Sequence, residues 1–378
     1  MPKINPTIAA LPASGIRAIT ELAVSQPGCL RLEIGEPGFD TPPHIVEAAA
    51  KAARDGFTRY TAGQGILSVR EAMSAKLAHI NGLDVPPDRI IITHGAMSGL
   101  FNAFAAMIAP GDEVLLPDPG WPNWEMMVRM LGGTARGYRL AAHNGFIPDP
   151  AAVAQAITPR TRAIVVNSPS NPTGSVYPAA VLEALVELAR RHDLWLISDE
   201  CYDEICFDAD HVSPARFDTD GRVVSVFSCS KTYAMTGWRI GYVAAPLTMA
   251  ATLAKLQQPI LANACAVSQK AAEAALTGPQ AGVGRMRDHY RARREQAMGL
   301  LKARGIASYC PQGAFYLMVE TGQDSDMFAR TLLAERNVAV APGAAFGAAA
   351  RSLVRVALCV EADVLEAGLS AVLDAITL

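Results

Sequence analysis

The sequence predicts an α/β protein: a large domain with a mostly parallel sheet flanked by helices, plus a smaller α+β domain. The chain has 378 residues, which suggests two domains at roughly 150 residues each. Hydrophobic residues make up 51% and charged residues 18%, so the chain can bury a large core and is not mainly disordered. Short apolar runs alternate with helical stretches over much of its length, the pattern of crossover units in a parallel sheet.

The first elements along the chain are helical. Pro and Gly interrupt the first 40 residues, which leave room for one short helical stretch. The pattern becomes regular from Pro43 onward, and a Gly-containing loop then separates two longer helices. In order, we expect a helix near 16–24, a helix over 43–56, a loop over 60–65 and a helix over 66–81.

Six short runs rich in Ile, Val and Leu predict the strands of the large domain. They end at turn residues or lead directly into a helix, as strands of a wound sheet do. The predicted strands are 89–93, 113–116, 163–166, 194–198, 223–227 and 240–244. The predicted helices among and after them are 95–108, 178–192 and most of 248–277.

The character of the sequence changes near residue 280. A long polar helix is expected over roughly 281–304, followed by further strands with helices between and after them. These strands are expected at 306–309, 315–319 and 353–359. We therefore predict a large domain over 41–280, and a small domain made of 1–40 and 281–378.

Charge and composition exclude several classes of partner. The formal net charge is 33 − 36 = −3, with no basic tail, which argues against nucleic acid as a partner. No apolar run reaches the roughly 18 residues that a membrane helix needs, and the first residues do not resemble a signal peptide. Seven scattered cysteines without a CxxC pair are typical of buried thiols in a reducing compartment. We expect a cytoplasmic protein that binds neither membranes nor nucleic acid.

Unusual residues gather where the predicted strands end, which is where open α/β sheets bind ligands. Gly95 follows a strand and opens a helix, whose free N–H groups favour an anion. Asp199 ends an apolar strand, where a carboxylate needs a positive partner. Lys231 follows another strand and is a candidate to form a Schiff base. The hydroxyls of Ser228 and Ser230, together with Arg239, would suit a phosphate.

These features together fit pyridoxal phosphate, which needs a lysine for its aldehyde, an aspartate for its ring nitrogen and an anion site for its phosphate. Other chemistries lack their motifs. The sequence has no HExxH and no paired Cys/His spacing for a metal. It has no GxSxG for a serine hydrolase and no GxGxxG after the first strand for a dinucleotide.

From about residue 10 to residue 375, the sequence resembles the class I aminotransferases of pyridoxal-phosphate fold type I. The resemblance is strongest to the bacterial aspartate aminotransferase subgroup. The motifs that carry it are IGEPGFDTP (34–42), YTAGQGILSVREA (60–72), THGAMSGLFNAF (93–104), NSPSNPTG (167–174), SDECYDE (198–204), SCSKTYAMTGWRIGY (228–242), QGAFY (312–316), APGAAFG (341–347) and VRVALC (354–359).

The resemblance implies a role for each matching position. Lys231 would bind the cofactor covalently, Asp199 would pair with its ring nitrogen, and Tyr202 with Asn171 would bond its ring oxygen. Trp121 would stack on the ring, although Trp124 is a competing candidate. The phosphate would be held by the backbone of Gly95, Ala96 and Met97, by Ser228, Ser230 and Arg239, and by Tyr60 of a neighbouring subunit.

The implied substrates are an L-amino acid and a 2-oxo acid, and the implied assembly is a homodimer with shared sites. Arg355 would bind the substrate's α-carboxylate, with Asn171 and Gly35 lining that pocket. In some relatives a lysine that helps with acidic substrates stands where this chain has Met97, so we expect a neutral or hydrophobic donor. Three alternatives stay open: an aspartate aminotransferase proper, a C–S β-lyase on the same fold, and a non-catalytic module that senses pyridoxal phosphate.

Overall fold

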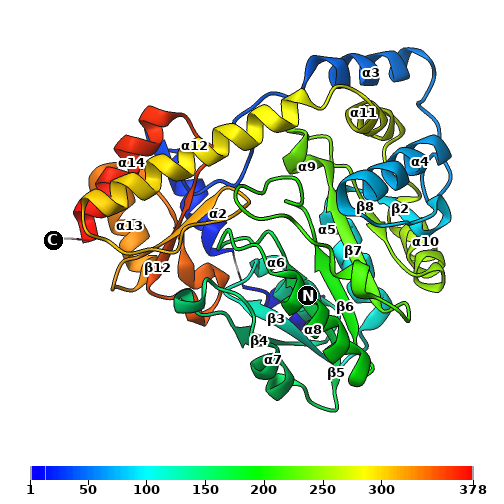
Figure 1. Cartoon of the computed structure of the whole chain (residues 1–378), viewed down its shortest axis with the longest axis horizontal. Coiled ribbons are helices and arrows are strands. Elements are labelled where there is room, and N and C mark those ends of the chain that lie inside the picture. The colour runs from blue at the N-terminus through cyan, green and yellow to red at the C-terminus, as the bar shows by residue number, and fades with distance from the viewer. Residues whose placement is uncertain (1, 13, 377–378) are drawn as a thin grey trace.

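The computed structural model describes residues 2–12 and 14–376, and Figure 1 shows a large sheet with helices beside a smaller sheet. Within the described residues, the larger sheet has seven strands in the order β2-β8-β7-β6-β5-β3-β4. Strand β8 is antiparallel to both of its neighbours, and the other pairings are parallel. The prediction of a mostly parallel sheet is therefore confirmed. Their bounds are β2 (Ile90–Thr93), β3 (Glu113–Asp118), β4 (Thr134–Arg139), β5 (Thr161–Asn167), β6 (Trp195–Asp199), β7 (Val223–Ser228) and β8 (Gly241–Ala244).

Strand β5 shows how the apolar runs build two cores at once. Successive side chains of a strand point to opposite faces of the sheet. Ala163 and Val165 accordingly pack with helices α5 and α6, whereas Ile164 and Val166 pack with α7 and α8. The helices around the large sheet are α3 (Pro43–Arg54), α4 (Leu67–Lys76), α5 (Gly95–Met107), α6 (Pro122–Met130), α7 (Pro150–Ala156), α8 (Ala179–Arg191), α9 (Cys229–Thr232), α10 (Leu247–Leu261) and α11 (Ala266–Thr277).

The smaller part combines both ends of the chain. Strand β1 (Leu30–Arg31) pairs in parallel with β10 (Val338–Ala339), so an N-terminal segment joins C-terminal elements. Strands β9 (Tyr316–Glu320), β11 (Ala341–Pro342) and β12 (Leu353–Ala357) form an antiparallel sheet in the order β11-β12-β9. The helices here are α2 (Gly15–Val24), α12 (Ala281–Ala303), α13 (Ser325–Arg336) and α14 (Ala362–Ile376), and a short α1 (Pro6–Ala9) precedes them. The domain boundaries at residues 40 and 280 stay a prediction.

Helix α12 is the long polar helix predicted near 281–304, and it runs from beside α3 to α14 and the small sheet (Figure 1). The helical stretch expected over 248–277 is two helices, because the chain breaks at Ala262, which has a positive φ of 60°. No helix in the described part of the chain is long and apolar enough to cross a membrane. The cellular location of the protein stays a prediction.

The strand predicted at 306–309 is wrong. The segment has no regular secondary structure and pairs with no described strand, and the Ser308 hydroxyl donates to the Met318 carbonyl at 2.8 Å. A side-chain hydrogen bond therefore stands where a backbone ladder was expected. Strand β4 was not predicted from the sequence, because this edge strand is largely exposed and polar and carries no apolar run.

Candidate functional site

Parallel strands β5, β6 and β7 end side by side, and their registers bring the predicted site residues to one edge of the sheet. Asn167 at the end of β5 pairs in register with Asp199 at the end of β6, and Asp199 in turn pairs with Val226 of β7. The Asn167 amide donates to the Asp199 carbonyl at 2.8 Å, which fixes the two ends together. Ser228 then ends β7, three residues before Lys231. This edge is where the fold class predicts a ligand.

The start of helix α5 has the features of an anion site. Helix α5 begins at Gly95, and no side chain caps its first turn. Gly95 has a φ of +65°, and a Cβ there would lie 2.6 Å from Nη2 of Arg239, so the guanidinium lies against the helix start. On the other side Gly241 also leaves no room for a Cβ, which would lie 2.7 Å from the Ala96 nitrogen. Uncapped N–H groups next to an arginine suit a phosphate.

Two buried serines lie at the start of the neighbouring helix α9. The Ser228 hydroxyl oxygen accepts the Ser230 backbone N–H at 3.1 Å, so Ser228 caps that helix. Arg239 itself is exposed in the single chain, and its Nη1 donates to the Thr236 carbonyl at 2.6 Å. Ser228 also pairs in register with Gly241, which lies against the Ala96 nitrogen, so Ser228 and Arg239 both belong to the surroundings of the α5 start.

Lys231 lies on helix α9 with its amine in a largely apolar environment. Its Nζ donates to the Gly35 carbonyl at 2.6 Å and lies 5.9 Å from the centre of the Phe315 ring. Burial lowers the pKa of Lys231, and the positive charge of Arg355 acts in the same direction. A lysine with a lowered pKa is neutral more often at physiological pH, which is what a nucleophilic or proton-transferring amine requires.

Asp199 is a buried carboxylate without an ion-pair partner among the described residues. Burial raises its pKa to about 6, although the backbone N–H of Cys201, 3.3 Å from Oδ1, and the Trp124 indole oppose that rise. A carboxylate in such a position is stabilised when a cation is placed against it. This is the observation that tests whether pyridoxal phosphate fits, because its protonated ring nitrogen would be such a cation.

Arg355 forms a second anchoring point, on strand β12. The side chain is 3% exposed, and its two terminal nitrogens donate to Asn171 Oδ1 at 2.9 Å and to the Glu33 carbonyl at 2.6 Å. Nε has no hydrogen-bond partner. The rings of Tyr316 and Phe346 lie 4.3 Å and 4.8 Å from the guanidinium carbon. A planar guanidinium held between rings, with donors left over, suits a carboxylate ligand.

Tyr202 and Gly35 join the two anchoring points. The hydroxyl of Tyr202, in the turn after Asp199, lies 2.8 Å from the Tyr316 hydroxyl. A Cβ on Gly35 would overlap that same Tyr316 hydroxyl, so the backbone at Gly35 needs glycine for space. Residues 35, 202, 231, 316 and 355 thus belong to one connected group, drawn from five distant parts of the chain.

Three predicted residues are exposed or half-buried and lie outside this connected group. Tyr60 is 89% exposed and Met97 is 42% exposed. Trp121 is half-buried, packs edge-to-face on the buried Trp124 with ring centres 5.9 Å apart, and lines a cavity of about 220 Å³ that Phe346 also lines. The stacking role of Trp121 and the phosphate contact of Tyr60 stay predictions.

Tyr316, Phe346 and Phe315 received no predicted role from the sequence. The signal was present, since the motifs QGAFY and APGAAFG contain all three, but a motif does not say which side chain an aromatic ring will cover. No group of His, Cys, Asp and Glu side chains within residues 2–12 and 14–376 is arranged to hold a metal ion. The donor set fits pyridoxal phosphate: an anion site at α5, a lysine with a lowered pKa, and a buried carboxylate that lacks a cation.

Comparison with known proteins also supports a pyridoxal phosphate site. The sequence model of the family described as "Aminotransferase class I and II" matches residues 27–375. The aspartate/prephenate aminotransferase of Thermus thermophilus is 42% identical over 322 residues, 84% of this chain and 83% of that protein. A solved structure of Thermus thermophilus aspartate aminotransferase with maleate has a TM-score of 0.95 and 38% identity, and covers 100% of both chains. The aromatic aminotransferase of Pyrococcus horikoshii OT3 has a TM-score of 0.90 and 34% identity, and covers 96% of this chain and 98% of that one.

Proposed function

Because this chain belongs to the class I and II aminotransferases, which use pyridoxal phosphate to exchange amino groups between amino acids and 2-oxo acids, we propose that its amino donor is a neutral or hydrophobic L-amino acid. The observation that carries this proposal is the side chain at position 97. Met97 is 42% exposed in the first turn of α5, beside Gly95 and Arg239, and brings an apolar surface to this end of the site.

The residues of this chain divide the work of cofactor binding. Arg239, the start of α5 and the Ser228 and Ser230 hydroxyls would hold the phosphate. The Asp199 carboxylate would accept a hydrogen bond from the protonated ring nitrogen and so favour its charged form. The Tyr202 hydroxyl and the Asn171 amide would bond the ring oxygen. When bound, pyridoxal phosphate supplies an electron sink for the carbanion that forms on the substrate's Cα.

Lys231 is the residue that binds the cofactor and moves the proton. Its lowered pKa makes the neutral amine easier to form, and that neutral amine would take the proton from the substrate's Cα and return a proton later in the cycle. Arg355 orients the substrate for this step, because its guanidinium is already held by Asn171 and the Glu33 carbonyl and loses little freedom on binding the carboxylate. Burial between two rings keeps water from that contact.

A donor screen tests the proposed substrate class. The enzyme, loaded with pyridoxal phosphate, is mixed with single L-amino acids without an acceptor, and the loss of yellow absorbance and the 2-oxo acid released are measured. We expect a response to neutral and aromatic donors and a weak one to aspartate. Release of pyruvate and ammonia from a cysteine conjugate without an acceptor would instead favour a β-lyase.

The Met97→Lys variant tests the residue that carries the proposal. A lysine here would offer a charge-assisted hydrogen bond to a distal carboxylate, so kcat/KM for aspartate should rise about 10-fold or more relative to wild type. Met130→Lys is the matched control, because Met130 is 44% exposed on helix α6 and should leave the ratio between donors unchanged. Equal donor ratios in both variants would count against a specificity role for Met97.

Aspartate is the second candidate donor, and one observation favours it. The Thermus thermophilus relative, 42% identical, is named for aspartate and prephenate. An arginine or lysine from elsewhere in the assembly would then have to meet the distal carboxylate. A wild-type response to aspartate as strong as to any neutral donor would select this candidate.

We also propose a homodimer in which each subunit completes its partner's site. Tyr60 is 89% exposed, and Ile260 at 52% and Leu261 at 37% form further exposed apolar surface on helix α10. Subunit mixing provides the test: Lys231→Ala and Tyr60→Ala homodimers are mixed after mild dissociation. If sites are shared, the mixed dimers regain activity, because one of their two sites has both residues intact. Activity equal to the sum of the separate variants would refute shared sites.

A further inference from the structure

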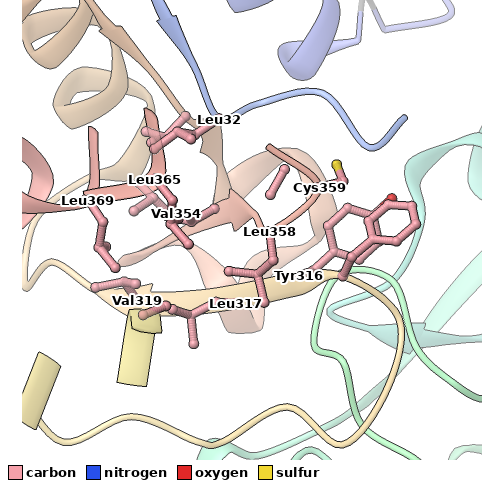
Figure 2. Packing of buried hydrophobic residues seen from close by; sticks show 14 of the residues in the cluster. Leu32, Tyr316, Leu317, Val319, Val354, Leu358, Cys359, Leu365 and Leu369 are labelled. Carbon is pink, nitrogen blue, oxygen red and sulfur yellow. The ribbon is translucent and has the colours of Figure 1, made fainter. Parts of the chain in front are cut away.

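Tyr316 is the buried residue that connects the two anchoring points, and nothing above gives it a role in the reaction. It begins strand β9 and lies at one end of the small-domain core beside Cys359, away from Leu365 and Leu369 (Figure 2). Its ring lies 4.3 Å from the Arg355 guanidinium carbon, and its hydroxyl lies 2.8 Å from the Tyr202 hydroxyl. One side chain therefore contacts both the proposed carboxylate-binding residue and a proposed cofactor-binding residue.

The ring and the hydroxyl of Tyr316 are both held in place. In the antiparallel pairing of β9 with β12, Tyr316 faces Ala357, and Arg355 lies two residues earlier on the same strand. The hydroxyl fills the space beside Gly35, where a Cβ would overlap it. The Gly35 carbonyl in turn accepts the Lys231 amine at 2.6 Å. Movement of the Tyr316 hydroxyl would therefore disturb Tyr202 on one side and the Gly35 backbone on the other.

Only one proton can lie in the hydrogen bond between the two hydroxyls, so only one of the two tyrosines is the donor. If Tyr202 donates to Tyr316, the proton of Tyr202 is used and cannot reach the cofactor's ring oxygen. If Tyr316 donates to Tyr202, the proton of Tyr202 stays free to do so. A hydroxyl that already accepts one hydrogen bond is a stronger donor in another, because hydrogen bonds in a chain polarise one another.

We propose that Tyr316 is a positioning residue with two separable parts: its ring supports Arg355 for the substrate's carboxylate, and its hydroxyl donates to Tyr202 so that Tyr202 donates to the cofactor. The proposal rests on the roles proposed above for Arg355 and Tyr202. It predicts that substrate binding and the electronic state of the cofactor respond to different halves of one side chain.

The charged and titratable groups around the pair are few. Arg355 faces both tyrosines from β12, and Cys201 faces them from the turn after β6. Cys359, two residues beyond β12, and Tyr290 of helix α12 face Tyr316. Burial raises the pKa of Tyr316 to about 12 and also raises the pKa of Tyr202, while Arg355 acts to lower both. Both hydroxyls are therefore protonated at neutral pH, as the proposed arrangement requires.

Two substitutions separate the ring from the hydroxyl. Tyr316→Phe keeps the ring, so KM for the amino acid should change less than about twofold, while the pH midpoint of the cofactor's visible absorbance should shift by about 0.5 pH unit or more. Tyr316→Leu also removes the ring, so KM should rise about tenfold as well. The absorbance titration needs no turnover and reads the cofactor's surroundings directly.

A double-mutant cycle with Tyr202→Phe tests the coupling itself. Tyr316→Phe should shift the midpoint in the same direction as Tyr202→Phe, and the double variant should shift it no further than Tyr202→Phe alone. Tyr290→Phe is the matched control, because Tyr290 is equally buried beside Phe315 and its hydroxyl has no hydrogen-bond partner. Its midpoint should stay within about 0.2 pH unit of wild type.

The outcomes distinguish this inference from the proposed function. If Tyr202→Phe shifts the midpoint and Tyr316→Phe does not, or if their shifts add in the double variant, the coupling is wrong and the role of Tyr202 stands. If neither variant shifts the midpoint, the role of Tyr202 and the coupling are both wrong. If Tyr316→Leu leaves KM unchanged, the support of Arg355 by the ring is refuted.

Discussion

Replacing Gly95 by alanine should weaken cofactor binding by at least as much as it weakens the fold. Gly95 has a φ of +65°, a conformation that costs a non-glycine residue about 1–2 kcal/mol. The new Cβ would lie 2.6 Å from Nη2 of Arg239, so the guanidinium must move away by about 1 Å to reach an ordinary contact distance. A hydrogen bond to a charged group contributes about 1.5–3 kcal/mol. Loss of one such bond to the phosphate predicts a rise of about 10- to 150-fold in the Kd for pyridoxal phosphate.

The assay is a titration of the apoenzyme with pyridoxal phosphate, followed by visible absorbance, beside urea unfolding of the apoenzyme. Gly284→Ala is the matched control: Gly284 lies within helix α12, and its Cβ would meet nothing within 4 Å. It should stabilise the fold by about 0.5–1 kcal/mol and leave the Kd unchanged. Arg239→Gln provides a second variant that removes the charge without adding a Cβ at Gly95. An unchanged Kd in both Gly95→Ala and Arg239→Gln would refute the assignment of the phosphate to this end of α5.

Three further predictions follow from buried charges. Arg355→Lys should raise KM for the amino donor about 10- to 100-fold with a smaller effect on kcat. The reason is that a lysine ammonium lacks the planar guanidinium group, which can donate to Asn171 and to a carboxylate at the same time. Steady-state kinetics with the best donor measures this. Because the pKa of Asp199 is raised to about 6, the folded apoenzyme binds more protons than the unfolded chain between about pH 4 and pH 6. The free energy of unfolding should therefore fall by up to about 3 kcal/mol as the pH rises through that window. Asp199→Asn should flatten this part of a urea-unfolding pH profile, and an equally steep profile would contradict the assignment. Lys76→Met should destabilise the protein by about 3–5 kcal/mol in urea, because it leaves the buried Asp203 without its ion-pair partner, whereas Lys76→Met combined with Asp203→Asn should recover part of that loss.

The core of the fold was predictable because its signals are local. Apolar runs such as 163–166 and 194–198 lie in strands that are almost entirely buried, and such strands carry a continuous hydrophobic signal. Edge elements lack that signal: β4 is largely exposed, and nothing in its sequence separates it from a polar loop. The segment 306–309 had the composition of a strand, but the Ser308 hydroxyl bonds the neighbouring strand in place of a ladder.

The candidate site divides in the same way. Lys231, Asp199 and Gly95 could be selected from the sequence because each lies at the end of a strand or within three residues after it, and the ends of parallel strands meet. Tyr316 and Phe346 could not, because their importance depends on lying against Arg355. Tyr316 reaches it through the register of β9 with β12, whereas Phe346 lies in a separate turn after β11. From the sequence, Asn171 was predicted to contact the cofactor's ring oxygen and to line the substrate pocket. In the structure, its amide oxygen accepts a hydrogen bond from Arg355.

The sequence by itself determined the α/β class, the succession of buried strands along the chain, the family and the residues at the strand ends. These follow from hydrophobic periodicity, composition and turn residues, and each of those signals depends on only a few neighbouring positions. The tertiary structure decided which distant residues meet: the Gly35 carbonyl with Lys231, the Tyr202 hydroxyl with Tyr316, and Arg355 between two rings. Such contacts depend on strand register and on packing between distant segments: Gly35 and Lys231 are 196 residues apart, and Tyr202 and Tyr316 are 114 apart. A shift of one residue in register turns every side chain of a strand to the opposite face, so no local pattern can specify them.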